Sequence, residues 1–256
     1  MLIRDLMTKR VITLDADAKL IDAVSLMVNH GFRHVPIIRD NTVVGLITAL
    51  SIIKDVDKMG IQVLSGYVRD ASLIANFIKA SQSDDVNDIV KKMINERMDA
   101  ALVFDGDTVI GIITERDLVH KIPAQLFSRR RIFDVMSGKP VVLDLDSSIN
   151  DSIKTAATHD IRHLLIARGD RVMGVVSIRD ILRHLMKHVE VGKGIDLGLS
   201  ISSIMSHNPI TIDPGAYVID AVNLMRNNNV SSLPVVERGK LMGIVTERDL
   251  IREIIT

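Results

Sequence analysis

Apolar residues spaced three and four positions apart recur along this chain of 256 residues. Ile21, Val24 and Met27 form the first such group, and similar groups surround Asp88 and Asp220. This spacing is typical of the apolar face of an α-helix. We therefore predict an amphipathic helix at each of these places.

Short apolar runs that end in a polar turn follow the predicted helices. Pro36-Ile37-Ile38 leads into the turn Arg39-Asp40-Asn41, a pattern that predicts a β-hairpin. A second amphipathic helix is expected after each hairpin, as at residues 249–254. Each repeat should thus have the order β-α-β-β-α. The first strands are predicted at Val11-Ile12-Thr13, Pro140-Val141-Val142 and Pro209-Ile210-Thr211.

The second strand of each hairpin carries a pattern that we call the glycine motif: a glycine, two β-branched or leucine residues, a Ser or Thr, and usually an aspartate three residues later. Its glycines, Gly45, Gly111, Gly174 and Gly243, recur at intervals of 63 to 69 residues, so the chain should consist of four related units. The predicted repeats are residues 1–60, 61–125, 126–190 and 191–256. A proline and a basic run in residues 121–131 indicate a joint between two halves. The predicted fold class is α/β, with four β-α-β-β-α units in two paired modules.

Composition and charge narrow the function classes. Hydrophobic residues make up 47% of the chain and cysteine is absent, which predicts real cores without disulfides or thiolate metal sites. No apolar stretch approaches the roughly 18 residues needed to cross a membrane, so we expect a soluble, cytoplasmic protein that does not bind membranes. Lys plus Arg equals Asp plus Glu at 32 each, and aromatic residues are only 3%. Nucleic-acid binding is therefore not favoured.

Three copies of a Met-Ser/Thr entry signature precede the predicted first strands. They are Asp5-Leu6-Met7-Thr8, Asp134-Val135-Met136-Ser137 and Ser203-Ile204-Met205-Ser206, while repeat two has Ala71-Ser72-Leu73 instead. Residues 1–7 are assigned to repeat one. With this signature and the fourfold glycine motif, the chain resembles proteins of four cystathionine β-synthase (CBS) domains arranged as two Bateman modules. Similar chains include stand-alone archaeal proteins and the gamma subunit of AMP-activated protein kinase.

The resemblance implies clefts between paired domains that bind adenosine-containing ligands, AMP, ADP or ATP, for sensing. An ionised carboxylate can accept both hydroxyls of a ribose diol, and Asp117, Asp180 and Asp249 are candidates for that role. The glycine would permit close backbone approach, and a helix would begin at the Ser or Thr. The residues that would hold phosphate are Thr114, Ser177, Thr246, Arg116, Arg179 and Arg248. The spacing alone favours a different role, a capping box at the helix start, and the resemblance reverses that preference.

Repeat one lacks the acid and carries Ser51 in its place, so its cleft should be empty or occupied differently. A second set lies at the start of the hairpins: Arg33, His34, Arg162 and His163. In similar proteins this position reaches the phosphates of the neighbouring domain's nucleotide. That would bring Arg162 and His163 to the site of Asp249, and Arg33 and His34 to that of Asp117. A second positive group there would favour more highly charged nucleotides. The alternative is an exposed arginine beside a packed histidine.

Two histidines and several methionines are weaker candidates for functional residues. His184 and His188 have metal-compatible spacing, but complementing the carboxyl end of a helix is the better interpretation, so no metal site is expected. The methionines at positions 27, 93, 173, 225 and 242 are expected to fill cores.

The sequence therefore predicts a non-catalytic sensor that needs no cofactor, binds an adenosine ligand and regulates an unidentified protein, with homodimer formation left open. The alternatives are a nucleic-acid-associated or scaffolding protein that uses Arg129-Arg130-Arg131, or an S-adenosylmethionine sensor.

Overall fold

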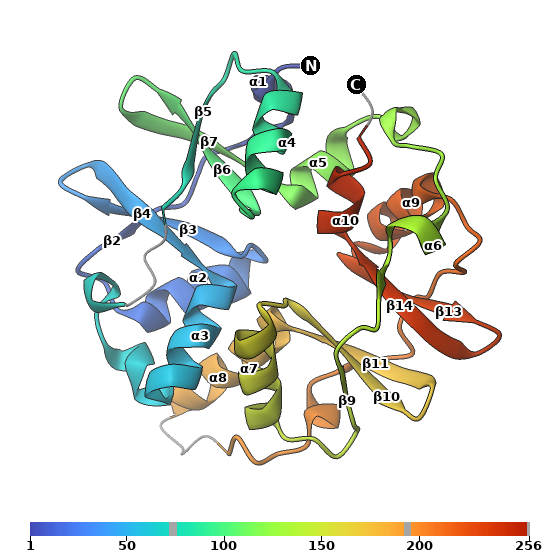
Figure 1. Cartoon of the computed structure of the whole chain (residues 1–256). Helices are drawn as coiled ribbons and strands as arrows, with labels where there is room; N and C mark the ends of the chain where they lie inside the picture. The colour runs from blue at the N-terminus through green and yellow to red at the C-terminus, as the bar shows by residue number, and fades with distance from the viewer. Residues whose placement is uncertain (72–75, 192–195, 255–256) are drawn as a thin grey trace. The chain divides into compact units, whose positions relative to one another are not determined.

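The computed structural model describes residues 1–71, 76–191 and 196–254, with side chains of 188–191 excepted. The chain forms two compact units (Figure 1). Unit 1 comprises Met1–Val11, Phe77–Pro140 and Pro209–Thr256, and unit 2 comprises Ile12–Asn76 and Val141–Asn208. Unit 1 therefore contains repeats two and four, and unit 2 contains repeats one and three. Among the described residues, no helix has the length and apolar character required to cross a membrane.

The order β-α-β-β-α is confirmed in three repeats and nearly complete in the fourth. Repeat one has β2 (Leu14–Asp15), α2 (Leu20–His30), β3 (His34–Arg39), β4 (Thr42–Thr48) and α3 (Ala49–Met59). Repeat two has β5 (Ile78–Ser81), α4 (Val86–Asn95), β6 (Ala100–Asp105), β7 (Thr108–Thr114) and α5 (Glu115–Lys121). Repeat three has β9 (Val142–Leu143), α7 (Ile149–His159), β10 (His163–Arg168), β11 (Arg171–Ser177) and α8 (Ile178–Val191). Repeat four has α9 (Val218–Asn228), β13 (Ser232–Glu237), β14 (Lys240–Thr246) and α10 (Glu247–Ile251), and its first strand is a single bridge from Ile212 to Val235.

Short elements connect the repeats. The entry segments contain α1 (Ile3–Leu6), β1 (Thr8–Lys9), α6 (Ile132–Val135), β8 (Ser137–Gly138) and β12 (Ser206–His207). The 3-10 helices are η1 (Ile61–Ser65), η2 (Val68–Asp70), η3 (Ala124–Leu126) and η4 (Ile201–Ser203).

The predicted hairpins are present in all four repeats. Asp40 and Asn41 both have positive φ, 49° and 60°, the backbone of the tight turn that matches the twist of the flanking strands. Each hairpin also has a register shift at the same place, as between Ile37 and Ile38. The four repeats thus share detail beyond their element order.

The first strands were predicted a few residues too early. Val11–Thr13 is not a strand, and the parallel pairing with β3 starts at Leu14, opposite Ile37. Leu14 packs against the core of unit 2, whereas Ile12 is 37% exposed. The β-branched run was misleading because the strand forms where side chains meet the core.

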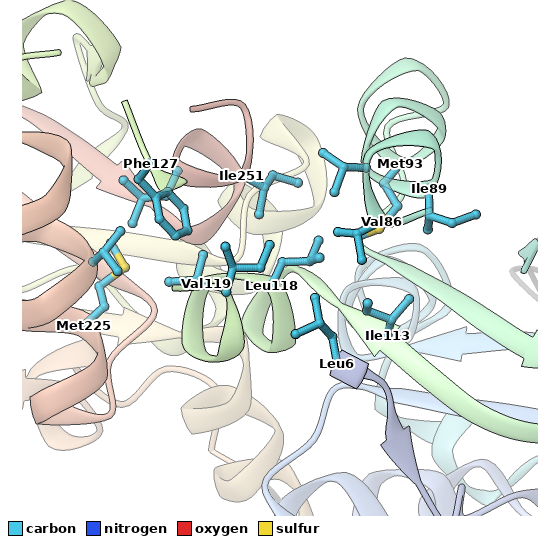
Figure 2. Packing of buried hydrophobic residues seen from close by; sticks show 14 of the residues in the cluster. Leu6, Val86, Ile89, Met93, Ile113, Leu118, Val119, Phe127, Met225 and Ile251 are labelled. Atoms are coloured by element: carbon cyan, nitrogen blue, oxygen red, sulfur yellow. The ribbon is translucent and has the colours of Figure 1, made fainter. Parts of the chain in front are cut away.

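Each unit has its own hydrophobic core, built from the helices of two repeats. In unit 1, helices α5 and α10 contact each other, and Figure 2 shows Leu118 and Val119 of α5 among side chains that include Ile251 of α10. In unit 2, α3 contacts α7 and α8, and α2 contacts α8. Met27, Met93 and Met225 are buried as predicted, whereas Met173 and Met242 are only partly buried.

Candidate ligand-binding site

Each described entry strand completes the sheet of a repeat other than the one that follows it in the chain. Strand β1 pairs antiparallel with β7 of repeat two, so the segment assigned to the start of repeat one leads into a strand in the sheet of repeat two. Strand β8 pairs with β14 of repeat four, and β12 pairs with β11 of repeat three. The entry of repeat two, at Ser72-Leu73, lies outside the described residues. The glycine motif is thus bordered by a strand from elsewhere in the chain.

The motif glycines make room for the methionine of that entry strand. A Cβ on Gly111 would lie 2.6 Å from Sδ of Met7, and one on Gly174 would lie 2.6 Å from Sδ of Met205. At Gly243 the nearest atom is the carbonyl oxygen of Ser137, at 2.7 Å. The space beside these glycines is therefore filled by the entry segments, and a close approach to a ligand there stays a prediction.

The Ser or Thr and the aspartate of the motif form a capping box in three repeats. Oδ2 of Asp117, Asp180 and Asp249 accepts the backbone N–H of Thr114, Ser177 and Thr246 at 3.0, 2.9 and 2.8 Å. The same oxygen accepts their hydroxyls at 2.7, 2.6 and 2.7 Å. Thr114 and Thr246 are N-caps, so their helices begin one residue later than predicted. One carboxylate oxygen of each aspartate is thus used structurally.

Ser51 forms the same box in repeat one without a charge. Its hydroxyl accepts the N–H of Thr48 at 3.0 Å and donates to the carbonyl of Thr48 at 2.8 Å. A serine is therefore sufficient to cap this helix, and an aspartate is not required for capping alone.

The other carboxylate oxygen, Oδ1, distinguishes the three aspartates. In Asp117 it accepts the hydroxyl of Thr8 at 2.7 Å and lies 2.7 Å from Nζ of Lys121. In Asp180 it pairs with Arg183 at 2.8 Å, between side chains 22% and 47% exposed. In Asp249 it has no hydrogen bond or ion pair within the described residues. Of the roughly four lone-pair sites of a carboxylate, hydrogen bonds use three in Asp117, three in Asp180 and two in Asp249. At Asp117 the ammonium of Lys121 adds a fourth group.

Asp249 is also the aspartate with an unfavourable environment for its charge. Burial raises the pKa of Asp249 above its ordinary value, and the nearby charge of Glu115 adds to this effect. The two hydrogen bonds from Thr246 and the charge of Arg252 act in the opposite direction. Additional donors at Oδ1 would stabilise the ionised form.

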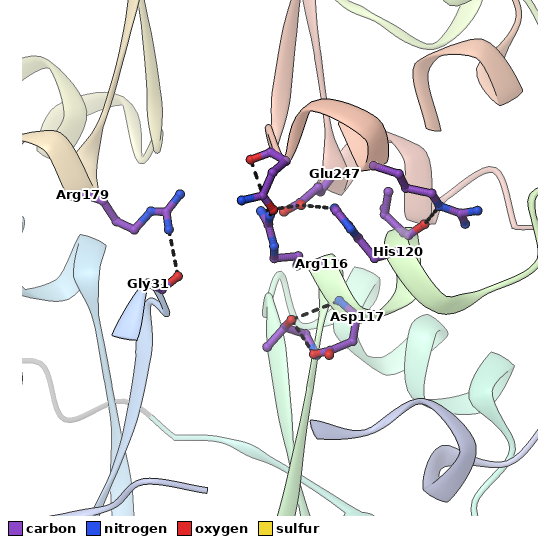
Figure 3. A network of polar contacts seen from close by, with 10 residues as sticks. Gly31, Arg116, Asp117, His120, Arg179 and Glu247 are labelled. Atoms are coloured by element: carbon purple, nitrogen blue, oxygen red, sulfur yellow. Dashed lines mark hydrogen bonds and ion pairs between the residues drawn. The ribbon is translucent and has the colours of Figure 1, made fainter. Parts of the chain in front are cut away.

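The arginines of the motif in unit 1 form reciprocal ion pairs. Nη1 of Arg116 lies 3.4 Å from Oε1 of Glu247 (Figure 3). Nε of Arg248 donates to Glu115 at 2.8 Å. Both glutamates are buried, at 2% and 1% exposure. The sequence analysis missed these glutamates, although Thr-Glu-Arg-Asp occurs in repeats two and four at the same position. These two arginines join helices α5 and α10.

A histidine lies beside one of these pairs. Nε2 of His120 is 3.8 Å from Oε1 of Glu247. Burial lowers the pKa of His120, as do the charges of Arg116 and Arg226, while Asp117 raises it.

In unit 2 the predicted phosphate-binding residues lie close to one another. Nη1 of Arg179 donates to the carbonyl of Gly31 at 2.8 Å (Figure 3). Desolvation and the charges of Arg33, Arg162 and Arg179 hold the pKa of His163 well below its ordinary value. These surroundings disfavour a charged His163, so its role as a second positive group stays a prediction that they do not support. His34 is buried at the start of β3.

The remaining candidates have structural roles or fall outside the described part. Arg130 pairs with Glu253 at 2.9 Å, and Arg131 lies over the ring of Tyr217, 3.8 Å from its centroid. The arginine run thus contacts unit 1 itself. The side chain of His188 lies outside the described residues, and within them no group of His, Cys, Asp and Glu side chains could hold a metal ion.

Comparison with known proteins agrees with the repeat structure. The model of the CBS domain matches residues 3–58, 68–124, 132–187 and 201–256. Each match lies within one predicted repeat, although the exact boundaries stay predictions. An uncharacterized protein of Methanocaldococcus jannaschii, MJ1225, is 22% identical over 270 residues, which cover 95% of each chain. An uncharacterized 33.4 kDa protein of Thermofilum pendens is 23% identical over 92% of this chain and 85% of that protein.

Solved structures show the same fold over the full length. The crystal structure of MJ1225, described as a candidate archaeal homolog of g-AMPK, has a TM-score of 0.88 at 20% identity, covering 98% of this chain and 99% of that one. A conserved protein of Pyrococcus horikoshii has a TM-score of 0.67 at 18% identity, with full coverage of both chains.

Proposed function

Because the chain belongs to the CBS-domain family, we propose that it is a non-catalytic regulatory protein of the cytoplasm that binds an adenosine-containing ligand, AMP, ADP or ATP. In this proposal Asp249 accepts the ribose diol. The relation of MJ1225 to g-AMPK supports a regulatory role.

The single observation that carries the proposal is the unused oxygen of Asp249. Its Oδ1 has two open lone-pair sites, while Oδ2 is held by Thr246. A vicinal ribose diol presents two hydroxyl donors at fixed spacing, and Oδ1 can accept two hydrogen bonds. The raised pKa of Asp249 supports the same conclusion, because donors at Oδ1 would relieve the cost of its buried charge.

The residues predicted to bind the phosphates of the ligand have other partners or lie in the other unit. Thr246 is already bonded to Asp249, and Arg248 to Glu115, so neither is poised for phosphate in this arrangement. Arg162 belongs to unit 2 and Asp249 to unit 1, and their proximity stays a prediction.

The experiment is titration calorimetry of adenosine, AMP, ADP, ATP and S-adenosylmethionine into the full chain. Asp249→Asn should weaken the tightest ligand about tenfold or more, because a hydrogen bond to a charged group contributes roughly 1.5–3 kcal/mol. Asp220→Asn is the matched control, since Asp220 caps α9 through the N–H of Tyr217 at 2.8 Å and should leave affinity unchanged. Unchanged affinity of Asp249→Asn, or no binding of any of these compounds to the wild type, would refute the proposal.

S-adenosylmethionine carries the same ribose diol, so the titration also decides between it and the nucleotides. For the nucleic-acid alternative, Arg130 and Arg131 are already engaged, because they contact Glu253 and Tyr217.

A further inference from the structure

The carboxylate of Asp117 is saturated by groups of the chain itself. Oδ2 accepts the N–H and the hydroxyl of Thr114, and Oδ1 accepts the hydroxyl of Thr8 and forms an ion pair with the ammonium of Lys121. Three hydrogen bonds and one ion pair thus engage the two carboxylate oxygens, which offer about four lone-pair sites. A ribose diol that arrived at Asp117 would find no free acceptor.

The two groups on Oδ1 are held in place by further contacts. Nζ of Lys121 also donates to the carbonyl of Leu6 at 2.7 Å and lies 3.3 Å from Oγ1 of Thr8. Thr8 is fixed by the pairing of β1 with β7, in which it faces Ile112. The Asp117 side chain is only 11% exposed, so water competes weakly for its oxygens. The lysine and the entry strand therefore hold the site as one arrangement.

The equivalent positions in repeat four lack this arrangement. Ser137 stands where Thr8 stands, directly after the entry methionine and paired with β14, yet within the described residues its hydroxyl makes no hydrogen bond to Asp249. Four residues after Asp249 comes Glu253, which binds Ser128 and Arg130, whereas four residues after Asp117 comes Lys121. At this position the sequence thus places a cation beside Asp117 and an anion after Asp249, whose neighbour Arg252 forms no ion pair with it within the described residues.

From this contrast we propose that Thr8 and Lys121 occupy the place of a ribose diol at Asp117 and keep the adenosine site of repeat two closed, which leaves Asp249 as the open site. This inference rests on the proposed function, since it concerns which of the predicted sites takes an adenosine ligand. Asp180 is intermediate, because the exposed Arg183 can leave its Oδ1 with little loss.

The test counts bound AMP per chain by equilibrium dialysis, using the wild type and the Thr8→Val/Lys121→Met variant. The variant should bind one additional AMP per chain. Adding Asp117→Asn to it should abolish the additional site, and Asp249→Asn added instead should leave that site intact. Lys9→Met, on the same strand, is the control and should bind like the wild type.

The results of this experiment distinguish the proposed function from the closed site at Asp117. If the wild type binds AMP and the variant gains no site, the closure is refuted while the proposed function stands. If neither protein binds AMP, ADP or ATP, the proposed function and the closure both fail. Should the double variant not fold, as judged by circular dichroism, Lys121→Gln alone serves. Lys121→Gln should raise the affinity of the Asp117 site for AMP at least about tenfold, because it removes a charged group from Asp117. An unchanged affinity would refute the proposal that Thr8 and Lys121 close this site.

Discussion

The contrast between Asp117 and Asp249 predicts different losses of stability for one substitution. In Asp117→Asn, a single carbonyl oxygen replaces two carboxylate oxygens that together accept three hydrogen bonds and pair with Lys121. The new NH₂ group must face donors that it cannot bind. In Asp249→Asn, the carbonyl can keep both hydrogen bonds from Thr246, and the NH₂ replaces an oxygen that has no partner in the described part of the chain.

The magnitudes follow from the hydrogen bonds and ion pairs that each substitution removes. For Asp117→Asn, removal of the bond from Thr8 to a charged oxygen should cost about 1.5 kcal/mol. The ion pair with Lys121, whose side chain is 40% exposed, should add no more than about 0.5 kcal/mol because solvent screens it. Together these losses are about 2 kcal/mol, in addition to the cap term that both substitutions share. Asp249→Asn should cost no more than about 1 kcal/mol, the range of a cap substitution.

The measurement is urea unfolding without nucleotide, followed by circular dichroism, with the shift in midpoint read at equal slope. Hydrogen exchange supplies a local readout, because removal of the Thr8 hydrogen bond should speed exchange of amides in residues 1–11 in Asp117→Asn only. Asp220→Asn again serves as the control for a cap without the second set of hydrogen bonds. Equal losses for Asp117→Asn and Asp249→Asn would refute the lone-pair argument.

Two further predictions concern the open site and the glycine motif. The affinity for adenosine, which has no phosphate to titrate, should fall as the pH is lowered through the pKa of Asp249, because protonation removes an acceptor. Burial raises this pKa above 3.8. Titration calorimetry should show the fall in the wild type and a flat profile in Asp249→Asn. Gly243→Ala should lower the free energy of unfolding by about 2 kcal/mol, and by more than Gly111→Ala does. A Cβ at position 243 would lie 2.7 Å from a backbone oxygen, whereas a Cβ at position 111 would lie 3.3 Å from the nearest one. Gly138→Ala, with nothing within 4 Å, is the control in thermal unfolding, and equal melting temperatures for all three would contradict the steric argument.

The repeat pattern predicted most of the fold because its signals are local. The helical spacing around Asp22 and the turn at Asp40-Asn41 depend on neighbours a few residues away, and α2 and the β3–β4 hairpin formed where predicted. The first strands did not, because a two-residue strand such as β2 is defined by its partner β3.

The site was predicted only in part, for the same physical reason. The spacing of Thr246 and Asp249 correctly predicted a capping box, yet it could not show which oxygen remained open. That depends on contacts such as the one between Thr8 and Asp117, which are 109 residues apart in sequence. Likewise, the ion pair of Arg248 with Glu115 required the packing of α5 against α10.

The exchanged entry strands bear on how such a chain could have arisen. Repeat three supplies β8 to the sheet of repeat four, and repeat four supplies β12 to the sheet of repeat three. A gene that encoded one of these repeats alone would leave β11 or β14 with an open edge, and open edges favour aggregation. A two-repeat chain, or a dimer of single repeats, is therefore the smallest arrangement in which both of these sheets receive their entry strand.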